Sequence, residues 1–206
     1  FFPTLPVGSL PRPRWIRDII ESRKIGLVEH LEAENILDAA IPAAIRMQEQ
    51  AGLDFVSDGE WRRESYVKVF SDSVDGFQAD LIPTGGSGIS GLSYPAVVSK
   101  IVKRNSFAIN EATFLRSQTN KKTIVALPSP YTIGRRMWSS KHSTTAYPRI
   151  EDFMEACIPI IRDEIRDLTK LGVDAVQLDD PWLALLIDPN YREREGVTNV
   201  EHEIEL

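Results

Sequence analysis

Short apolar segments alternate with amphipathic helical segments along this chain, and that alternation constrains the fold more than any other feature of the sequence. Strand-like runs at residues 5–9, 53–57, 123–127 and 173–178 each stop at glycine, proline or aspartate. Helical periodicity begins near residue 14, returns over residues 33–51 and covers residues 149–171 before the fourth run. Strands that alternate with helices in this way indicate β-α-β units and a parallel sheet.

The sequence therefore predicts an α/β fold of the (β/α)8 TIM-barrel type, with only about the first four β/α units present in this chain. An open doubly wound sheet is the alternative, but its first strand is usually followed by a glycine-rich nucleotide turn. Here Gly8 is followed by Ser9, Leu10 and Pro11, which do not match that turn. Because a full barrel takes about 250 residues, we expect residues 1–206 to be the N-terminal half of a barrel domain.

The stretch between the second and third strand-like runs departs from the alternation. Residues 75–91 include Gly85-Gly86-Ser87-Gly88 and predict an exposed loop; no Lys-Ser or Lys-Thr follows, as a phosphate-binding loop would need. Residues 97–103 and 106–109 resemble two arms of a β-hairpin around Arg104-Asn105. We therefore expect a hairpin excursion over about residues 95–115.

Charge and composition exclude several classes of protein. The net charge of -6 argues against a nucleic-acid partner, whose binding surface would be basic. No apolar run is long enough to cross a membrane, so we expect no membrane partner. Cys157 is the only cysteine and cannot form an internal disulfide, which favours a reducing, cytoplasmic location.

Polar residues stand where the predicted strands end, and in a barrel of this kind the active site forms at that edge. Carboxylates suit the ammonium group of a small zwitterionic ligand, and backbone N–H groups near a glycine suit its carboxylate. The sequence thus predicts an amino-acid-like ligand bound by residues from four strand ends: Gly8-Ser9, Asp58-Gly59-Glu60, Ser129 with Tyr131-Thr132, and Asp179-Asp180.

Each of these residues also has a purely structural interpretation, because Asp and Ser often cap helices or form turns. Asp180, before a proline, can be a turn residue. Cys157 lies on the apolar face of a helix and is expected in the core. The arginine pairs at 62–63 and 135–136 can bind an anion but are more often solvated. None of the three histidines (His30, His142 and His202) has a second ligand at metal-binding spacing.

Several blocks of the sequence recur in the order of one known family and span nearly the whole chain. Val7-Gly8-Ser9 is similar to an Ile-Gly-Ser segment, and residues 48–54 with Asp58-Gly59-Glu60 are similar to a "QEELGLD…HGE" stretch. Residues 130–133 resemble "GPVTI", and residues 171–174 with 177–181 resemble "AGI…QIDEP". Together these blocks resemble the catalytic domain of cobalamin-independent methionine synthase.

This resemblance implies an S-methyltransferase that moves a methyl group to the zinc-bound thiolate of homocysteine, giving methionine. It implies that Val7, Gly8 and Ser9 bind the substrate carboxylate. It also implies that Glu60 and Asp179 receive the substrate ammonium group and are the catalytic residues.

Two positions depart from the family pattern. The second acid of "DEP" is Asp180 here, which has a shorter side chain. The tryptophan that stacks on the folate in that family would fall on Arg136, with Trp138 two places on, so folate is not expected as the methyl donor.

The zinc ligands of the family, a His-x-Cys pair, a glutamate and a second cysteine, lie beyond the last residue of this chain. We therefore expect the chain to be part of a longer methyltransferase and to supply no metal ligands. The alternatives are a half-barrel completed by a partner or by a second copy, a non-catalytic remnant that binds a small amino acid, and a relative that acts on another thiol, as coenzyme M-type transferases do.

Overall fold

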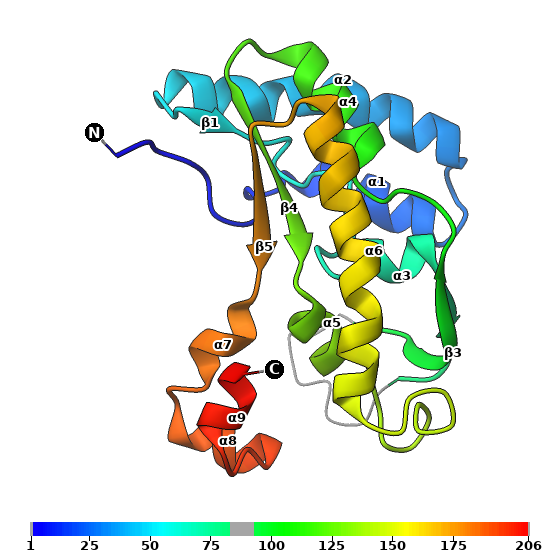
Figure 1. Cartoon of the computed structure of the whole chain (residues 1–206). Helices are drawn as coiled ribbons and strands as arrows, with labels where there is room; N and C mark the ends of the chain where they lie inside the picture. The colour runs from blue at the N-terminus through cyan, green and yellow to red at the C-terminus, as the bar shows by residue number, and fades with distance from the viewer. Residues whose placement is uncertain (1, 83–92, 206) are drawn as a thin grey trace. The chain divides into compact units, whose positions relative to one another are not determined.

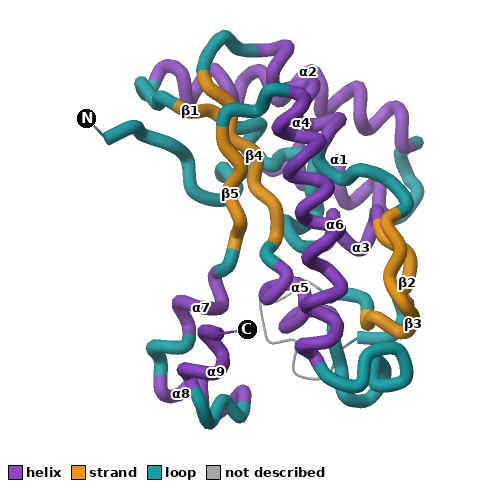
Figure 2. The backbone as a smooth tube through the Cα atoms, viewed as in Figure 1, coloured by secondary structure: helices purple, strands orange, loops and turns teal. Residues whose placement is uncertain are grey.

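The computed structural model describes residues 2–82 and 93–205 and shows a mixed α/β fold with a parallel sheet (Figure 1). The sheet has three strands in the order β1-β4-β5, where β1 is Phe55–Val56, β4 is Lys122–Pro128 and β5 is Ala175–Asp179. Strands β1 and β4 are parallel, with Phe55 opposite Lys122 and Val56 opposite Thr123. Figure 2 shows β4 and β5 side by side.

Helices and a second small sheet make up the rest of the described chain. The second sheet pairs β2 (Val74–Gln78) and β3 (Ala96–Lys103) in antiparallel fashion, with an irregularity between Asp75 and Phe77. The helices are α1 (Arg14–Lys24), α2 (His30–Gln50), α3 (Lys68–Ser73), α4 (Ile109–Gln118), α5 (Pro130–Met137), α6 (Ile150–Leu171), α7 (Pro181–Leu185), α8 (Pro189–Glu195) and α9 (Val200–Glu205). In the described part of the chain, no helix is long and apolar enough to cross a membrane.

The chain divides into two compact units. The first unit comprises Phe1–Val69, Ser106–Leu127 and Glu164–Gln177. The second comprises Phe70–Asn105, Pro128–Asp163 and Leu178–Leu206. Because α6 and the chain through β4 and β5 contribute to both, each unit is assembled from segments far apart in the sequence.

The core of the first unit forms where helix α2 turns its apolar face inward. Leu37, Ile41 and Ile45 recur at helical spacing and are at most 1% exposed. A buried amide at the end of this face links the helix to the sheet: the Gln48 side chain donates to the Ser57 carbonyl at 2.8 Å and accepts from the Ser57 N–H at 2.9 Å. These two hydrogen bonds hold the end of β1 at a defined place beside α2.

The core of the second unit is rich in aromatic side chains. Phe77 lies edge-on to Phe153, with ring centroids 6.2 Å apart, and Tyr147 is tilted against Phe153 at 5.3 Å. The Tyr147 hydroxyl also accepts a hydrogen bond from the Ile101 N–H at 2.9 Å, which joins the aromatic cluster to β3. A neighbouring apolar cluster combines residues of α5, α6, α7 and α8: Tyr131, Met154, Trp182, Leu186 and Tyr191.

The structure confirms most of the elements expected from the sequence. The helices predicted from residue 14, over 33–51 and over 149–171 are α1, α2 and α6, and α2 continues through Pro42. The strands predicted at 53–57, 123–127 and 173–178 are β1, β4 and β5, although β1 has only two residues.

Two sequence predictions about strands are wrong. Residues 5–9 form no strand in the described structure, because Pro6 cannot donate to a ladder and Gly8 adopts a left-handed φ of 71°. The hairpin expected from 97–103 and 106–109 does not form either: β3 pairs with β2, whereas residue 109 begins α4. Residues 74–78, partly assigned to a loop, are β2, and the glycine run at 85–88 lies outside the described residues.

Helix α4 begins at an N-cap residue whose own side chain cannot cap it, although the Ser106 hydroxyl accepts from the Ile109 N–H at 3.2 Å. Its N-cap residue is Ala108, and the buried carboxylate of Glu164 takes the place of a cap. The Glu164 Oε1 atom accepts hydrogen bonds from the N–H groups of Phe107 at 3.1 Å and Ala108 at 2.8 Å, and from the Ser106 hydroxyl. Unsatisfied N–H groups at a buried helix start are costly, so Glu164 is expected to contribute much to stability.

We expect Glu164→Ala to lower the free energy of unfolding by about 3 kcal/mol, because it leaves two backbone N–H groups without an acceptor. Urea denaturation measures this loss. Glu155→Ala, at an exposed position of the same helix, is the matched control and should change stability by less than about 0.5 kcal/mol. Equal stability of the Glu164→Ala variant and the wild type would contradict this role.

Candidate functional site

A tight turn follows β1 and presents two carboxylates in the first unit. Gly59 has a φ of 71°, and a Cβ added there would lie 3.2 Å from the Leu10 side chain. Glu60 follows with a φ of 56°, and it is the only non-glycine residue of the described chain with a positive φ. A non-glycine residue with a backbone conformation in this unfavourable region requires support from its surroundings. Such residues are found most often at functional sites.

Hydrogen bonds to the backbone supply that support. The Glu60 N–H donates to Asp58 Oδ1 at 2.9 Å, and the Glu60 carbonyl accepts from the Arg12 guanidinium at 2.8 Å. The Arg63 N–H also donates to the Glu60 carbonyl, at 3.2 Å. Asp58 and Glu60 are 7% and 4% exposed, so both carboxylates lie inside the protein.

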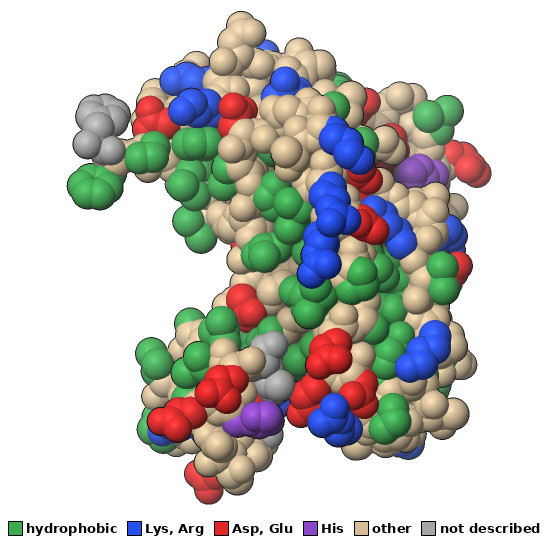
Figure 3. Space-filling model, in the orientation of Figure 1, with side chains coloured by type: hydrophobic (Ala, Val, Ile, Leu, Met, Phe, Trp, Pro, Cys, Tyr) green, Lys and Arg blue, Asp and Glu red, His purple; other side chains and the backbone are tan. Residues whose placement is uncertain are grey.

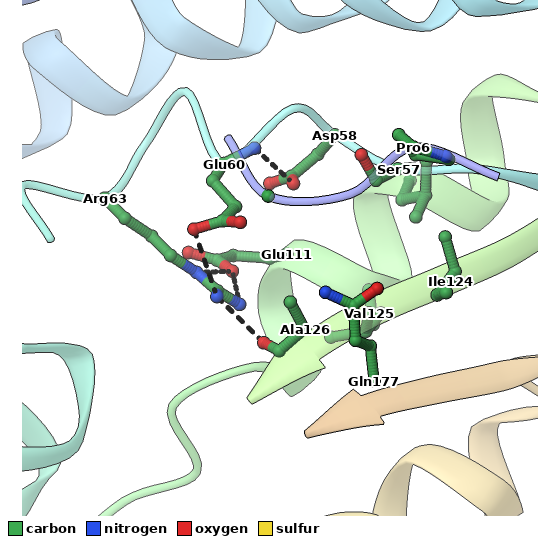
Figure 4. Close-up of a pocket in the computed structure, with 13 residues that line it drawn as sticks. Pro6, Ser57, Asp58, Glu60, Arg63, Glu111, Ile124, Val125, Ala126 and Gln177 are labelled. Carbon is green, nitrogen blue, oxygen red and sulfur yellow. Dashed lines mark hydrogen bonds and ion pairs between the residues drawn. The ribbon is translucent and has the colours of Figure 1, made fainter. Parts of the chain in front are cut away.

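Arg63 lies in the middle of this cluster and joins three segments of the chain (Figure 4). Its guanidinium donates to Glu111 of α4 through Nε at 2.9 Å and Nη2 at 2.8 Å, and to the Ala126 carbonyl of β4 at 2.8 Å. Its Nη1 atom lies 3.8 Å from Glu60 Oε2. The side chain of Arg63 is 1% exposed, so these contacts are made away from water.

The charges in the cluster influence one another. Burial raises the pKa of Glu111 to about 7, with Asp58 adding to the rise, although the facing Arg63 guanidinium lowers it. Burial alone would lower the pKa of Arg63, but Glu111, Asp58 and Glu60 outweigh that effect and hold it above its ordinary value. Arg63 is therefore charged at every physiological pH, whereas Glu111 titrates near neutrality.

A pocket with about 20 Å³ of space for a water-sized group opens beside these side chains, and its lining residues come from several segments of the first unit. Figure 4 shows Glu60, Arg63 and Glu111 along one side of it and the strand residues Ile124 and Val125 along another. Gly8 also lines this pocket. Because one water needs at least about 10–15 Å³, the enclosed part has room for one water-sized group, such as a single ammonium.

The ends of β4 and β5 in the second unit carry a separate polar cluster. Ser129 caps α5: its hydroxyl oxygen accepts from the Thr132 N–H at 2.9 Å and the hydroxyl donates to Asp180 Oδ2 at 2.7 Å. The Thr132 hydroxyl lies 3.2 Å from both Asp180 Oδ1 and the Asp179 carbonyl. Both Asp180 oxygens thus accept hydrogen bonds that fix the start of α5. Asp180 was considered from the sequence only as a turn residue, and the structure adds this role in positioning α5.

The family described as "Cobalamin-independent synthase, Catalytic domain" matches residues 2–198, which is almost the entire chain. The chain belongs to this family. Membership in the cobalamin-independent methionine synthase family, inferred from the strand-end motifs, is thereby confirmed.

Known relatives of the chain are methionine synthases. The chain is 29% identical over 183 residues to the methionine synthase of Sulfolobus acidocaldarius, covering 87% of this chain and 51% of that protein. It is 31% identical over 185 residues to that of Saccharolobus solfataricus, covering 88% of this chain and 53% of that protein. The chain therefore spans about half the length of these curated relatives.

Solved structures of the family have the same fold. A B12-independent methionine synthase from a Shewanella species, in complex with selenomethionine, superposes with a TM-score of 0.71 at 25% identity, covering 96% of this chain and 58% of that one. The putative vitamin-B12 independent methionine synthase from Listeria monocytogenes gives a TM-score of 0.69 at 22% identity, covering 99% and 61%.

In this chain, the structure places some of the predicted site residues close together. Gly8 and Glu60 line the same pocket, and Val7 and Ser9 flank Gly8 at exposed positions. Asp179 lies at the end of β5 in the second unit, where its carbonyl accepts from the Ser129 N–H at 3.1 Å. Sequence reasoning missed Glu111 because its partner Arg63 lies 48 positions away and no local pattern links the two.

The expectation that the paired arginines are solvated is wrong for both pairs. Arg62 and Arg63 are 8% and 3% exposed. Arg136 is 6% exposed, with its guanidinium 5.1 Å from the Tyr94 ring centroid and 4.5 Å from that of Trp182. Arg135 pairs with Glu203. Arginine was misjudged because a guanidinium becomes stable inside a protein once carboxylates and aromatic faces surround it.

Cys157 is in the core, as expected, with no exposed surface, and burial raises the pKa of its thiol well above the ordinary value. A buried, protonated thiol is a poor nucleophile and a poor metal ligand. Across residues 2–82 and 93–205, no group of three or more His, Cys, Asp or Glu side chains is placed to hold a metal ion. The zinc implied by the family therefore does not fit the described residues.

We expect the contribution of Glu111 to the free energy of unfolding to fall as the pH rises from about 4.5 to above 7. The pKa of Glu111 is about 7 in the folded chain, raised from 4.5, so the unfolded chain loses this proton at lower pH than the folded chain does. Urea denaturation from pH 5 to pH 8 measures the effect, and Glu111→Gln, which removes the titrating group, should flatten this part of the profile.

Glu64→Gln is the control for this pH dependence. Burial raises the pKa of Glu64, but hydrogen bonds from Lys68 and Lys24 outweigh it and lower the pKa below the usual value. This carboxylate therefore contributes stability above its unfolded pKa, the opposite sign to Glu111. A Glu111→Gln variant with the same slope as the wild type between pH 5 and pH 8 would contradict the assignment.

Proposed function

We propose that this chain carries the amino-acid-binding part of an S-methyltransferase that moves a methyl group to the sulfur of homocysteine, giving methionine. The observation that supports this most directly is the pocket of the first unit, which both Glu60 and Gly8 line and whose inner part has room for one ammonium group. A carboxylate and a glycine backbone are complementary to the two charged ends of an amino acid. The Shewanella relative, which was solved with selenomethionine, supports a ligand of the same class.

Each predicted residue has a distinct part in this proposal. Glu60 accepts the substrate ammonium group, because a buried carboxylate gains most from a charge-assisted hydrogen bond. The backbone at Val7, Gly8 and Ser9 binds the substrate carboxylate. Asp179 is proposed separately as a substrate-binding carboxylate of the second unit, on the resemblance of its "QLDDP" segment alone.

Zinc has no part in the steps that we assign to this chain, because the described residues do not provide a ligand set. The pocket residues bind and orient the amino-acid end of the substrate, which fixes the direction in which its sulfur extends. Positioning of this kind accounts for a large share of the rate in group-transfer enzymes. The methyl transfer itself belongs to the whole protein of the family.

We expect Glu60→Gln to weaken binding of L-methionine at least about tenfold, because it replaces a charge-assisted hydrogen bond by a neutral one. Isothermal titration calorimetry measures the affinity. Glu64→Gln is the matched control: Glu64 lies four positions along the same segment but pairs with Lys24 and Lys68 rather than lining the pocket. Asp179→Asn tests the second carboxylate in the same way.

Two results would overturn the proposal. One is a wild-type chain that binds no L-methionine at millimolar concentration. The other is unchanged affinity in both Glu60→Gln and Asp179→Asn while the folded state is intact by circular dichroism.

We also propose that the sheet is part of a larger (β/α)8 barrel, closed by further residues or by a second copy. Large hydrophobic side chains are exposed along the N-terminal segment: Phe2 is 95%, Leu5 40% and Val7 83% exposed. Figure 3 shows hydrophobic side chains gathered beside this segment on the visible face. Exposed apolar surface next to an open sheet edge favours association.

Sedimentation velocity tests this second proposal on the isolated chain. We expect association to at least twice the mass of 23.2 kDa at micromolar concentration, because a second copy would bury the exposed apolar side chains of the N-terminal segment. Val7→Asp should shift the distribution toward the monomer, and Val102→Asp, at an exposed position of β3, is the control. A monomer at all concentrations that also binds no hydrophobic dye would contradict it.

A further inference from the structure

Asp58 combines deep burial with an oxygen that has no hydrogen-bond partner. Its Oδ1 atom accepts from the Glu60 N–H at 2.9 Å. Its Oδ2 atom is buried and accepts no hydrogen bond from any described residue, although the residue lines the pocket beside Glu60. A buried carboxylate oxygen without a donor is unfavourable by several kcal/mol in an apolar medium, so a missing donor is expected here.

The charge of the cluster indicates what that donor is. Three carboxylates (Asp58, Glu60 and Glu111) face two guanidinium groups (Arg12 and Arg63). Neighbouring Arg62 does not correct the imbalance, because it is paired with Glu34 and Asp38 of α2. When Glu111 is ionised, the cluster has an excess of negative charge and favours a cation. When Glu111 is protonated the charges balance, and the buried Asp58 Oδ2 atom still lacks a donor.

The size and donor chemistry of the space select among cations. The enclosed volume of about 20 Å³ holds one water-sized group. A metal ion would need at least three suitably placed ligands, and the described residues contain no such group. A primary ammonium fits both limits, because it is small and has N–H donors for more than one carboxylate.

We propose that Asp58 determines specificity for the ammonium group of the substrate by accepting a hydrogen bond through its Oδ2 atom, next to Glu60. This inference rests on the proposed function, and it gives Asp58, which the sequence placed only within a strand-end motif, a specific role as a second acceptor for the ligand. In this arrangement one Asp58 oxygen fixes the backbone of Glu60 while the other contacts the ligand. The two carboxylates then discriminate an amino acid from the same molecule without its amino group.

Asp58→Asn separates the two roles of this side chain. Asparagine retains an oxygen for the Glu60 N–H but replaces the charged Oδ2 by an NH2 group, which repels an ammonium. Isothermal titration calorimetry would compare the affinity for two ligands. These are L-methionine and 4-(methylsulfanyl)butanoate, which is methionine without its amino group. We expect Asp58→Asn to weaken methionine binding at least about tenfold and to leave the affinity for the deaminated ligand unchanged or higher.

The matched control is Asp54→Asn. Asp54 lies just before β1, does not line the pocket, and accepts hydrogen bonds from the N–H and hydroxyl of Thr4, so it should affect neither ligand. Asp58→Ser is the second variant if asparagine disturbs the fold, because a serine oxygen can still accept from the Glu60 N–H. It should show the same difference between the two ligands.

The outcomes distinguish this inference from the proposed function. Equal loss of both ligands in Asp58→Asn, or no loss of either, would overturn the inference, since a purely structural role does not depend on the amino group. The proposed function would stand in that case if the wild type binds methionine and Glu60→Gln weakens it. A wild type that binds no methionine would overturn both.

Discussion

The buried guanidinium of Arg63 is the interaction on which the candidate site depends. It holds Glu111 of α4 and the Ala126 carbonyl of β4 together, and it lies 3.8 Å from Glu60 at the end of the β1 turn. A planar group with five donors can serve all three, whereas a lysine could not do so in one geometry. Without it, the Glu60 and Glu111 carboxylates would lie inside the protein without the cation that both of them face.

Comparing Asp58 with Asp180 shows how similar carboxylates differ in function. Both Asp180 oxygens accept hydrogen bonds from Ser129 and Thr132, so this side chain is used in building the start of α5. Asp58 uses one oxygen for the backbone of Glu60 and keeps the other buried toward the pocket. Sequence motifs place both residues at strand ends, and only their hydrogen bonds distinguish the structural role of Asp180 from the binding role proposed for Asp58.

The parts of the fold that could be predicted from sequence are those governed by local periodicity. The apolar spacing of α2 and α6 and the β-branched run of β4 predicted three elements close to their observed bounds. The pairing of β2 with β3 could not be predicted, because each paired residue of β2 lies opposite one that is 18 to 29 positions further along the chain. Asp58 and Glu60 were visible as a strand-end motif, whereas the Arg63–Glu111 pair arises only from tertiary contact.

A crystal structure of the chain with L-selenomethionine would show where the amino group binds, since the selenium signal locates the ligand without bias. We expect the ligand nitrogen within about 3.2 Å of both Asp58 Oδ2 and a Glu60 carboxylate oxygen, with the ligand carboxylate at the backbone of Gly8. A ligand nitrogen bound elsewhere, with Asp58 and Glu60 in contact only with water, would contradict this expectation.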